Sequence, residues 1–368
     1  MKSCDVLVLG GGIIGCALAE ELARHGQRVI VIERGCIGTE ASSAAAGILS
    51  AQMDLPQPGP MFELCQAARS LYPSWVKRIE RHAGISVGFH VDGILYLAFA
   101  SREEQAMERQ ARWQARRGLR VERWSRQDVR RNEPAVDGRL KRGFYFPAEA
   151  QVDNARLMHA LAAACRQAGV LIQEGTSARR ILVRRGAVRG VQTDRGSYEA
   201  PIIVNCLGSW AAMGGAFPIP LPVEPARGQI LAFDGPQQLF RHAVMSPRAY
   251  VVQRRDGRLI VGSTIERVGF QKALTAQGMH RILCGLRRFS SALNRCAFRE
   301  AWAGLRPYTP DHLPVLGATS IEGLYVATGH FRHGILLAPI TAKLTAELIL
   351  RGRSSLDLAP FALQRFSR

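Results

Sequence analysis

Three glycines and a later glutamate have the types and the spacing of a site that binds a dinucleotide. An apolar run at 5–9 precedes the glycines, and a helical pattern at 14–24 follows the first two of them. The glycines are Gly10, Gly12 and Gly15. In such a turn they allow, in that order, the tight turn, the approach of a pyrophosphate to the backbone and the packing of the helix on the sheet. A second apolar run, 28–32, ends in Glu33, so we expect the pyrophosphate at the helix N-terminus and the ribose hydroxyl groups on Glu33.

Small side chains fill the segment 38–49, which follows the second apolar run. Ser42 and Ser43 lie in this segment among alanines, and their hydroxyl groups can donate hydrogen bonds to a phosphate. A flexible linker or the start of a small-residue helix would also be rich in small side chains. Linkers are usually richer in charged residues and proline, which are scarce here. We therefore interpret the segment as backbone that lies flat against a large planar ligand.

The charge of the chain is strongly positive, but the basic residues are not arranged as a nucleic-acid site. The 368 residues carry a net charge of +19, and most of the basic residues are arginine. Arginine pairs are scattered along the chain, without interleaved aromatic residues or a nucleic-acid-binding motif. These pairs are Arg116-Arg117, Arg130-Arg131, Arg179-Arg180, Arg184-Arg185 and Arg287-Arg288. We expect a solvated basic surface and no nucleic-acid partner.

The spacing of cysteine and histidine predicts neither disulfide bonds nor a metal site. The eight cysteines form no CxxC pair, and several lie within apolar runs, where a thiol usually packs as a small core side chain. His330 and His333 have no carboxylate or thiolate neighbour in the sequence, so we expect no metal there. Asp5 and the glycines interrupt the first apolar run, which disfavours a signal peptide. We expect free thiols, no transmembrane segment and a cytoplasmic protein.

The elements that must position these residues alternate between strands and helices at both ends of the chain. A helix at 156–168 followed by a strand at 170–174 predicts a second unit of the N-terminal sheet. Near the C-terminus, a strand at 324–328 and a helix at 339–351, with Gly352 as its C-cap, continue this alternation of strands and helices.

Segments rich in predicted strands interrupt this alternation of strands and helices. A hairpin is expected at 85–98, about Asp92-Gly93, and a second hairpin at 250–264 is closed by Asp256-Gly257. Counting from a two-residue turn pairs Tyr250 with Ser263 and puts Ile265 on the same face of the sheet.

Together these elements and several short motifs resemble the D-amino-acid-oxidase-like FAD oxidoreductases, the family that includes glycine oxidase, sarcosine oxidase and D-amino acid dehydrogenase. The resemblance covers essentially the whole chain, and within the family the chain is most similar to glycine oxidases of thiamine biosynthesis. The motifs that carry it are Gly10–Gly15 with Glu33, Ser42–Gly47, Val152–Asn154, Asn205–Trp210, Pro225–Gln229, Gly304–Asp311 and Gly329–Pro339.

The resemblance implies a mixed α/β fold: a glutathione-reductase-like FAD-binding domain with an inserted antiparallel β-sheet substrate domain. The expected bounds are 1–84, 140–222 and 307–368 for the FAD-binding domain, and 85–139 and 223–306 for the substrate domain. Sarcosine oxidases of the family attach FAD at the segment that corresponds to Arg306–Thr309, where this chain has no cysteine. We therefore expect non-covalent FAD.

The resemblance also implies which residues hold FAD. They come from the glycine turn, the small-residue segment, the entry to a hairpin and the segment before the last helix. In chain order they are Gly10, Gly12, Ile13, Ile14, Gly15, Glu33, Arg34, Ala41, Ser42, Ser43, Ala46, Gly47, Ile48, Ala178, His330, Phe331, Arg332, His333, Gly334, Ile335 and Leu336. A helix N-terminus between Gly334 and Pro339 would stabilise the negative charge of the reduced flavin.

Four residues are expected at the substrate, namely Arg306, Tyr250, Arg332 and Ile265. Arg306 follows the apolar run 301–305, so it should project from a core strand, and its planar pair of donors fits a substrate carboxylate. The motifs imply that Tyr250 hydrogen-bonds the same carboxylate and that Arg332 lies near the flavin. Ile265 stands where well-known relatives have methionine, and His333 where glycine oxidases often have asparagine; both differences concern the range of substrates.

The expected reaction is the oxidation of a small amine such as glycine, sarcosine or D-alanine. Hydride leaves the substrate Cα for flavin N5, and O2 is reduced to H2O2. Two alternatives remain open: a D-amino acid dehydrogenase that passes electrons to a quinone, and an RNA-acting flavoprotein. Nothing in the sequence resembles a Ser/His/Asp triad, so hydrolysis is not expected. The sequence leaves the oligomeric state open, a homo-oligomer included.

Overall fold

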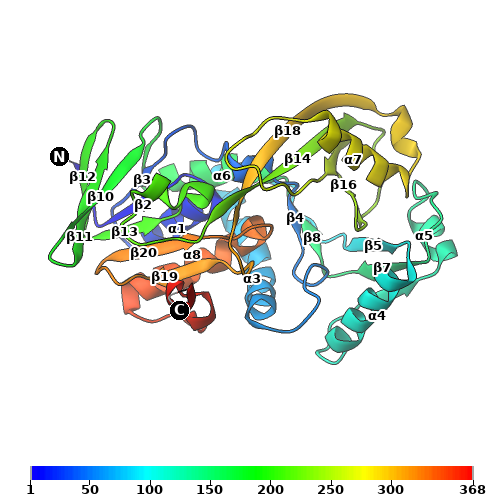
Figure 1. Ribbon diagram of the computed structural model, residues 1–368, viewed down its shortest axis with the longest axis horizontal. Coiled ribbons are helices and arrows are strands. Elements are labelled where there is room, and N and C mark those ends of the chain that lie inside the picture. Colours follow the sequence, from blue (N-terminus) through cyan, green and yellow to red (C-terminus); the bar gives the residue numbers. More distant parts are fainter. Residues whose placement is uncertain (1, 367–368) are drawn as a thin grey trace.

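A six-stranded sheet lies at the centre of one half of the molecule and carries the glycine-rich turn (Figure 1). The computed structural model describes residues 2–366. Five neighbouring strands run parallel, and β19 pairs antiparallel at one edge. From that edge the order is β19 (Val315–Ala318), β20 (Leu324–Thr328), β13 (Ile202–Asn205), β2 (Val6–Leu9), β3 (Val29–Ile32) and β9 (Leu171–Gln173).

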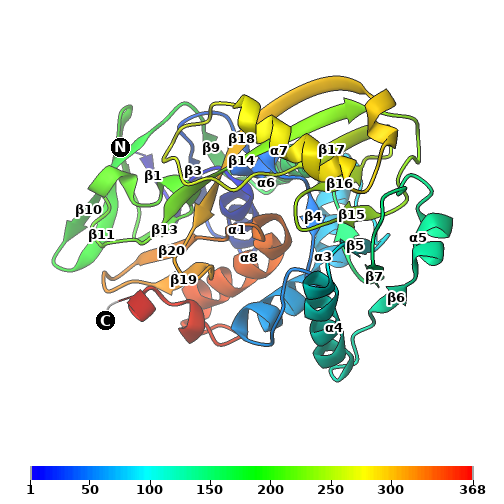
Figure 2. The same ribbon diagram turned by 45° about the vertical axis from the view of Figure 1, so that its right-hand side comes forward.

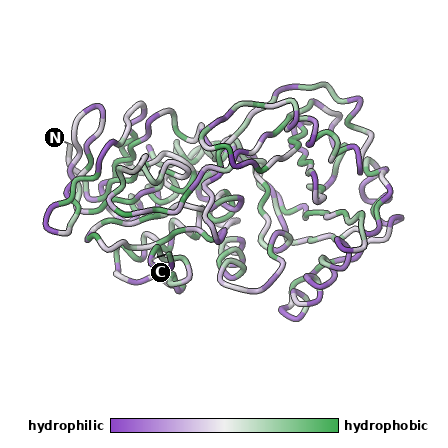
Figure 3. The backbone as a smooth tube through the Cα atoms, viewed as in Figure 1, coloured by the Kyte–Doolittle hydropathy of each residue, from purple (hydrophilic) through white to green (hydrophobic). Residues whose placement is uncertain are grey.

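Layers cover both faces of this sheet because its strands are apolar on both sides. In β2, Val6 and Val8 pack in the core formed with the helices, whereas Leu7 and Leu9 belong to the core on the other face. The helices are α1 (Ile13–Arg24), α3 (Pro60–Ala83), α6 (Asn154–Gln167) and α8 (Gly334–Arg351). The opposite layer is a four-stranded sheet of β1 (Lys2–Ser3), β12 (Gly196–Glu199), β11 (Ala187–Thr193) and β10 (Ala178–Arg184). Figure 3 shows that hydrophobic residues dominate the central strands.

A mostly antiparallel sheet of eight strands forms the other half of the molecule (Figure 2). Its order is β18 (Ala297–Tyr308), β14 (Glu224–Asp234), β17 (Arg258–Gly262), β16 (Tyr250–Gln253), β15 (Ala243–Met245), β5 (Ile94–Ala98), β7 (Arg142–Phe146) and β6 (Glu122–Trp124). One face packs against α7 (Ala276–Arg287) through Ile282 and Leu286. The opposite face contains Tyr250 and Trp302 and packs against Ala46, so it faces the small-residue segment.

Shorter elements complete the fold. They are α2 (Ala41–Ala44), β4 (Ile48–Leu49), β8 (Ala150–Gln151), α4 (Ser101–Ala115), α5 (Arg126–Asn132) and the 3₁₀ turns Gly208–Trp210, Met213–Gly215, Ala292–Arg295, Ala359–Phe361 and Leu363–Phe366. The carboxylate of Asp153 caps α6 by accepting the N–H of Arg156 at 3.2 Å. Gly352, with a φ of +70°, ends α8 as the sequence predicts.

The mixed α/β fold and the strand–helix–strand unit at the N-terminus are confirmed. The hairpin expected at 85–98 is wrong, because only its second half is a strand, β5, which pairs with β7 and β15. The preceding residues pair elsewhere: His90 bridges Gln151, and the N–H of Gly93 donates to the carbonyl of Glu149.

The hairpin of β16 and β17 is confirmed, but its turn has three residues instead of two. The N–H of Arg254 donates to the carbonyl of Arg258 at 2.8 Å, and Gly257 takes a φ of +93°. The register therefore differs by one residue, so Tyr250 lies opposite Gly262 and not opposite Ser263.

Helix α8 begins at Gly334, five residues before the expected start at Pro339. A proline inside a helix leaves the carbonyl four residues earlier without its usual donor. Here that carbonyl belongs to Ile335, and the hydroxyl of Tyr72 donates to it at 3.2 Å. The hydrogen bond from α3 thus replaces the one that Pro339 cannot donate.

The expected domain bounds differ from the two large sheets at two places. Strand β18 of the eight-stranded sheet extends to Tyr308, two residues beyond the expected end of the substrate domain at 306. Strand β7 lies within the segment 140–222 that was assigned to FAD binding, yet it pairs with β5 and β6 in the eight-stranded sheet. By sheet membership this segment begins after residue 146, and the rest of the division stays a prediction.

Candidate functional site

A cavity of about 350 Å³ lies between the two halves of the molecule. One wall is formed by the carboxyl ends of the parallel strands, where Gly10, Glu33, Cys206 and Thr328 line it. The opposite wall is the face of the eight-stranded sheet that bears Tyr250. The carboxyl edge of a parallel sheet is where such folds bind their ligands, because helix N-termini and loops converge there.

The glycine turn is packed so closely that side chains are excluded. Gly10 has a φ of +102°, and a Cβ built on it would lie 2.5 Å from the carbonyl oxygen of Cys206. A Cβ on Gly15 would lie 2.0 Å from the carbonyl oxygen of Gly10, so this glycine allows α1 to approach the turn. Gly12 differs from both, because a Cβ there would meet, among the described residues, only the hydroxyl oxygen of Ser42, at 3.2 Å. The space beside Gly12 belongs to the cavity.

Two acidic residues hold the end of the cavity next to β3: Glu33 binds backbone groups, and Glu40 binds a side chain. The carboxylate of Glu33 accepts the N–H groups of Gly11 and Gly35, each at 2.8 Å. It still lines the cavity, and a carboxylate has further lone pairs for a hydroxyl donor. Arg34 pairs with Glu40 at 2.8 Å.

Ser42 is joined to the start of α1. Its hydroxyl oxygen accepts the N–H of Ile13 at 2.9 Å, which leaves the hydroxyl hydrogen free to donate. The backbone carbonyls of Ser42 and Ser43 both accept hydrogen bonds from the side-chain amide of Asn154, at 2.8 and 2.9 Å. Ala41 and Ala46 also line the cavity, so the small-residue segment lies along it as expected.

The segment before α8 forms the floor of the cavity, and its two histidines are neutral at pH 7. Burial lowers the pKa of His330 to about 3, and its Nε2 lies 3.0 Å from the hydroxyl of Thr341. Burial also lowers the pKa of His333 to about 4, although Asp54 opposes this shift. The Nε2 of His333 has no hydrogen-bond partner among the described residues and lies 3.9 Å from a carboxylate oxygen of Asp54.

Arg306 is half-buried and faces the cavity. Its guanidinium donates to the carbonyl of Thr264 at 3.0 Å and to the hydroxyl of Ser263 at 2.8 Å. Burial lowers its pKa, Tyr250 opposes this shift, and among the described residues no carboxylate pairs with it. A partly desolvated guanidinium whose charge is not compensated by an anion is a strong site for a carboxylate ligand.

Tyr250 lies in the same wall, with its hydroxyl close to Gly262: a Cβ on that glycine would lie 2.4 Å from it. Burial raises the pKa of Tyr250, whereas Arg306 lowers it. Arg332 lies at the floor, 3.6 Å from Asp54. Ile265 lines the cavity, but 56% of it is exposed, so it lies at the mouth.

Most of the residues expected from the sequence line this cavity, and four do not. Those four are Gly15, Ser43, Ala178 and Leu336. Gly15 acts inside the turn, Ser43 presents only its backbone to Asn154, and Leu336 belongs to the core between sheet and helices. Ala178 starts β10 and packs in the core on the far side of the sheet, so its expected contact with the ligand stays a prediction.

Several lining residues were missed from the sequence. Asp54, Met245 and Arg248 come from loops or strand ends, where no local pattern announces a ligand contact. Glycines of the sheet wall were missed too, although glycine inside a strand is a signal of close approach. These glycines are Gly228, Gly262 and Gly304.

A glycine turn at the carboxyl edge of a parallel sheet, opening on a cavity that a second sheet closes, is typical of dinucleotide-dependent oxidoreductases. The chain belongs to the FAD dependent oxidoreductase family, whose model matches residues 5–348.

Relatives of known name extend this similarity over nearly the whole chain. A glycine oxidase of Geobacillus kaustophilus is 33% identical over 98% of this chain and 97% of its own length. The crystal structure of a glycine oxidase from that organism superposes with a TM-score of 0.96 at 32% identity, covering 99% of both chains. The bifunctional protein ThiO/ThiG of Synechocystis sp. is 39% identical over 98% of this chain but only 54% of its own length. The chain therefore spans about half of such bifunctional relatives.

FAD, the cofactor of this family, fits the nucleotide end of the cavity. The open side of Gly12 leaves room for a pyrophosphate against the backbone, directly before the first turn of α1. The carboxylate of Glu33 would hold the ribose hydroxyls, and the hydroxyl of Ser42 would donate to a phosphate. The first turn of α8, from Gly334, would present N–H groups to the flavin ring.

Proposed function

We propose that the protein oxidises glycine or another small amine that carries a carboxylate, with O2 as the electron acceptor. For glycine the balanced reaction consumes O2 and water and yields glyoxylate, ammonia and H2O2. When bound, FAD supplies the acceptor for the hydride that leaves the substrate Cα, and O2 then reoxidises it. The proposal rests on one observation above all: Arg306, a half-buried cation without a carboxylate partner among the described residues, lies in the cavity that the glycine turn also lines.

Arg306 and Tyr250 would together bind the carboxylate of such a substrate. Arg306 would bind the substrate carboxylate with its planar donors, and its own hydrogen bonds to Ser263 and Thr264 fix the orientation of the guanidinium. The hydroxyl of Tyr250 would donate to the same carboxylate. It stays protonated at pH 7 because burial raises its pKa.

Non-covalent attachment of FAD is part of this proposal. Cys206 is the cysteine that lines the cavity among the described residues. Burial raises its pKa well above the usual value, so its thiol stays protonated and is a poor nucleophile.

No specific observation favours the two alternatives. No helix within residues 2–366 is long and apolar enough to cross a membrane. The arginine pairs do not gather near the cavity: Arg184-Arg185 lies at the tip of β10 and β11, and Arg130-Arg131 lies in α5 at the opposite end of the molecule (Figure 1).

Anaerobic reduction tests the proposal directly. The purified protein, loaded with FAD, would be mixed without O2 with glycine, sarcosine, D-alanine and a long D-amino acid. We expect glycine, sarcosine or D-alanine to bleach the flavin absorbance, and readmitted air to restore the colour and produce H2O2. Bleaching that persists in air but is reversed by a quinone would favour a dehydrogenase, and no bleaching by any amine would refute the proposal.

A further inference from the structure

The cofactor-lining segment Ser42–Ala46 contains only the end of the single-turn helix α2, so most of its backbone carbonyl groups need partners from elsewhere. Side chains supply them at four carbonyl groups. The carbonyls of Ser42 and Ser43 accept from Asn154, and the carbonyl of Ala44 accepts from the indole of Trp302 at 3.0 Å. The fourth carbonyl, that of Ala46, accepts from the guanidinium of Arg254 at 2.8 Å.

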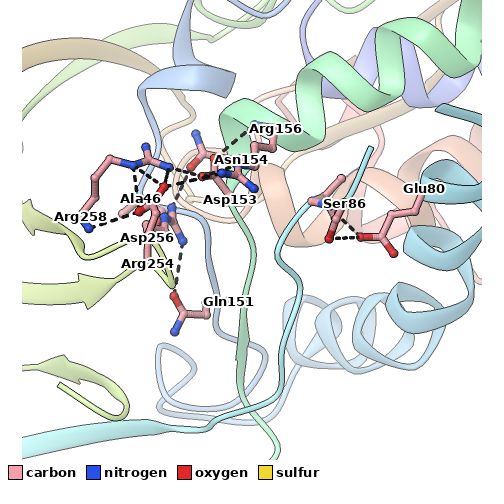
Figure 4. Close-up of polar contacts among 11 residues, drawn as sticks. Ala46, Glu80, Ser86, Gln151, Asp153, Asn154, Arg156, Arg254, Asp256 and Arg258 are labelled. Carbon is pink, nitrogen blue, oxygen red and sulfur yellow. Dashed lines mark hydrogen bonds and ion pairs between the residues drawn. The ribbon is translucent and has the colours of Figure 1, made fainter. Parts of the chain in front are cut away.

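Arg254 is a buried cation that pairs with neutral oxygens. It is 6% exposed, and besides Ala46 it donates to the amide oxygens of Asn154, at 3.2 Å, and Gln151, at 3.4 Å (Figure 4). Within residues 2–366 no carboxylate lies within ion-pair distance of it. Burial lowers its pKa to about 10, and the nearby carboxylate of Asp153 opposes the shift, so it is charged at pH 7. A desolvated charge at this place costs free energy, and the hydrogen bonds that Arg254 donates to three oxygen acceptors offset this cost.

The same guanidinium is anchored to the wall that carries Tyr250. Arg254 directly follows β16, and in a strand residues two and four apart share a face, so Tyr250, Val252 and Arg254 point to the same side. Tyr250 and Val252 both pack in the core that contains Ala46. Arg254 therefore joins the strand that bears Tyr250 to the backbone that lines the cofactor cavity.

The backbone at Gly47 is tightly packed against Arg254 and Val152. It has a φ of +68°, and a Cβ on it would lie 1.9 Å from the carbonyl oxygen of Val152 and 2.9 Å from a guanidinium nitrogen of Arg254. The N–H of Val152 in turn donates to the carbonyl of Gly47 at 2.9 Å. The turn at Gly47 is thus enclosed between Arg254 and the strand end before α6.

We propose that Arg254 is a positioning residue, which holds the backbone of 42–48 in its FAD-binding conformation and aligns it with Tyr250. It does not line the cavity, so it acts through the carbonyl of Ala46 and through Asn154. The effect on catalysis rests on the proposed oxidase function, whereas the effect on the segment and on FAD does not.

Arg258 provides a matched control in the same hairpin. It contacts Asp153 at 2.6 Å and Asp256 at 2.8 Å but no atom of 42–48 (Figure 4). Arg254→Met keeps the apolar stem and removes all three donated hydrogen bonds, and Arg258→Met removes a neighbouring charge of the same type. Arg254→Lys keeps the charge but loses the planar donors that reach several acceptors at once.

The test compares amide hydrogen exchange of peptides covering 41–49 in the FAD-free protein, and FAD affinity by flavin fluorescence. We expect Arg254→Met to accelerate exchange in that segment and to weaken FAD binding by about tenfold or more, since charge-assisted hydrogen bonds are lost. Arg258→Met should leave both near wild type. With saturating FAD, Arg254→Met should lower kcat for glycine with little change in KM, because Arg306 is untouched.

The proposal is overturned if Arg254→Met matches Arg258→Met in segment exchange and in FAD affinity. If Arg254→Met does not fold, Arg254→Lys decides: weaker FAD binding with faster exchange supports the proposal, and wild-type values overturn it. A wild-type protein that binds FAD but is not bleached by any amine refutes the oxidase function alone, because exchange and FAD affinity are measured without substrate.

Discussion

The guanidinium of Arg306 lies directly over the α-carbon of Gly228. A Cβ at Gly228 would lie 2.1 Å from the Nη1 of Arg306 and 2.5 Å from its Cζ. Gly228 pairs with Gly304 on the adjacent strand, and Arg306 pairs with Ala226, so the two are diagonal neighbours on the cavity face. The glycine thus makes the space in which the arginine lies flat.

Gly228→Ala should therefore displace Arg306 without removing it. Because the methyl group and the guanidinium cannot share this space, we expect kcat/KM for glycine to fall by about a hundredfold, the usual effect of misplacing a substrate-binding group by about 1 Å. FAD affinity serves as the internal control and should be unchanged. Wild-type kinetics with glycine would show that the position of Arg306 does not matter.

Arg306→Met should weaken carboxylate substrates by about 2–5 kcal/mol, the cost of losing one member of a buried charged pair. The measurement is kcat/KM for glycine beside that for ethylamine, which has no carboxylate. We expect the penalty to apply to glycine and to be much smaller for ethylamine. Equal penalties for both amines would argue against carboxylate binding by Arg306.

The glycines of the turn should separate stability from cofactor binding. Gly15→Ala places a methyl group 2.0 Å from a backbone oxygen, so we expect it to lower the free energy of unfolding by about 1–3 kcal/mol or more. Gly12→Val extends into the open cavity, so it should abolish FAD retention with a smaller loss of stability in the FAD-free protein. Full FAD occupancy of purified Gly12→Val would contradict the assignment of the pyrophosphate site.

The sequence could predict the parts of the site that are encoded locally. Gly10, Gly15 and Glu33 lie within one strand–helix–strand unit, so their spacing specifies their geometry. Arg306 was identified through the family motif, since position in an apolar run alone does not separate it from other arginines.

Contacts between distant segments could not be predicted. The early start of α8 depends on Tyr72 of α3, and the exact partner of Tyr250 depends on a turn with one additional residue. Asp54 lies at the floor of the cavity, directly after a loop whose backbone is bound by Glu149, far along the chain. Such partners are set by tertiary packing, which no local periodicity records.

Glu149 makes this loop sensitive to pH. It is fully buried and accepts the N–H groups of Ala51, Gln52 and Met53 at 2.7, 2.5 and 3.0 Å. Burial raises the pKa of Glu149 from 4.5 to about 7, although the backbone donors and Arg69 oppose the shift. In the unfolded chain the group ionises near 4.5. Its contribution to stability is therefore full below pH 4.5 and is lost as the pH rises through about 7.

We expect this loss to amount to about 3 kcal/mol, at about 1.4 kcal/mol for each pKa unit. The test is urea unfolding of wild type and Glu149→Gln at several pH values between 4.5 and 8. Other carboxylates cancel in the difference, so the advantage of wild type over the variant should shrink as the pH rises. A difference that is independent of pH would show that Glu149 does not titrate in this range.

The size of the substrate pocket should depend on Met245 more than on Ile265. The β-branched Ile265 is stiff, but it is 56% exposed at the mouth of the cavity, where an added substrate methylene can turn towards solvent. Met245 lines the cavity from the end of β15, is partly buried and packs beside Tyr250, so it bounds the inner space.

The comparison is the ratio of kcat/KM for glycine to that for a long D-amino acid in Ile265→Ala and in Met245→Ala. Ile265→Ala should change the ratio by less than about tenfold, which is the lower end of what one methylene contributes in an enclosed pocket. Met245→Ala should lower it by more than that, because the new space lies against the substrate side chain. If Ile265→Ala relaxes the preference and Met245→Ala does not, the side chain of the substrate points to the mouth, and Ile265 selects it there.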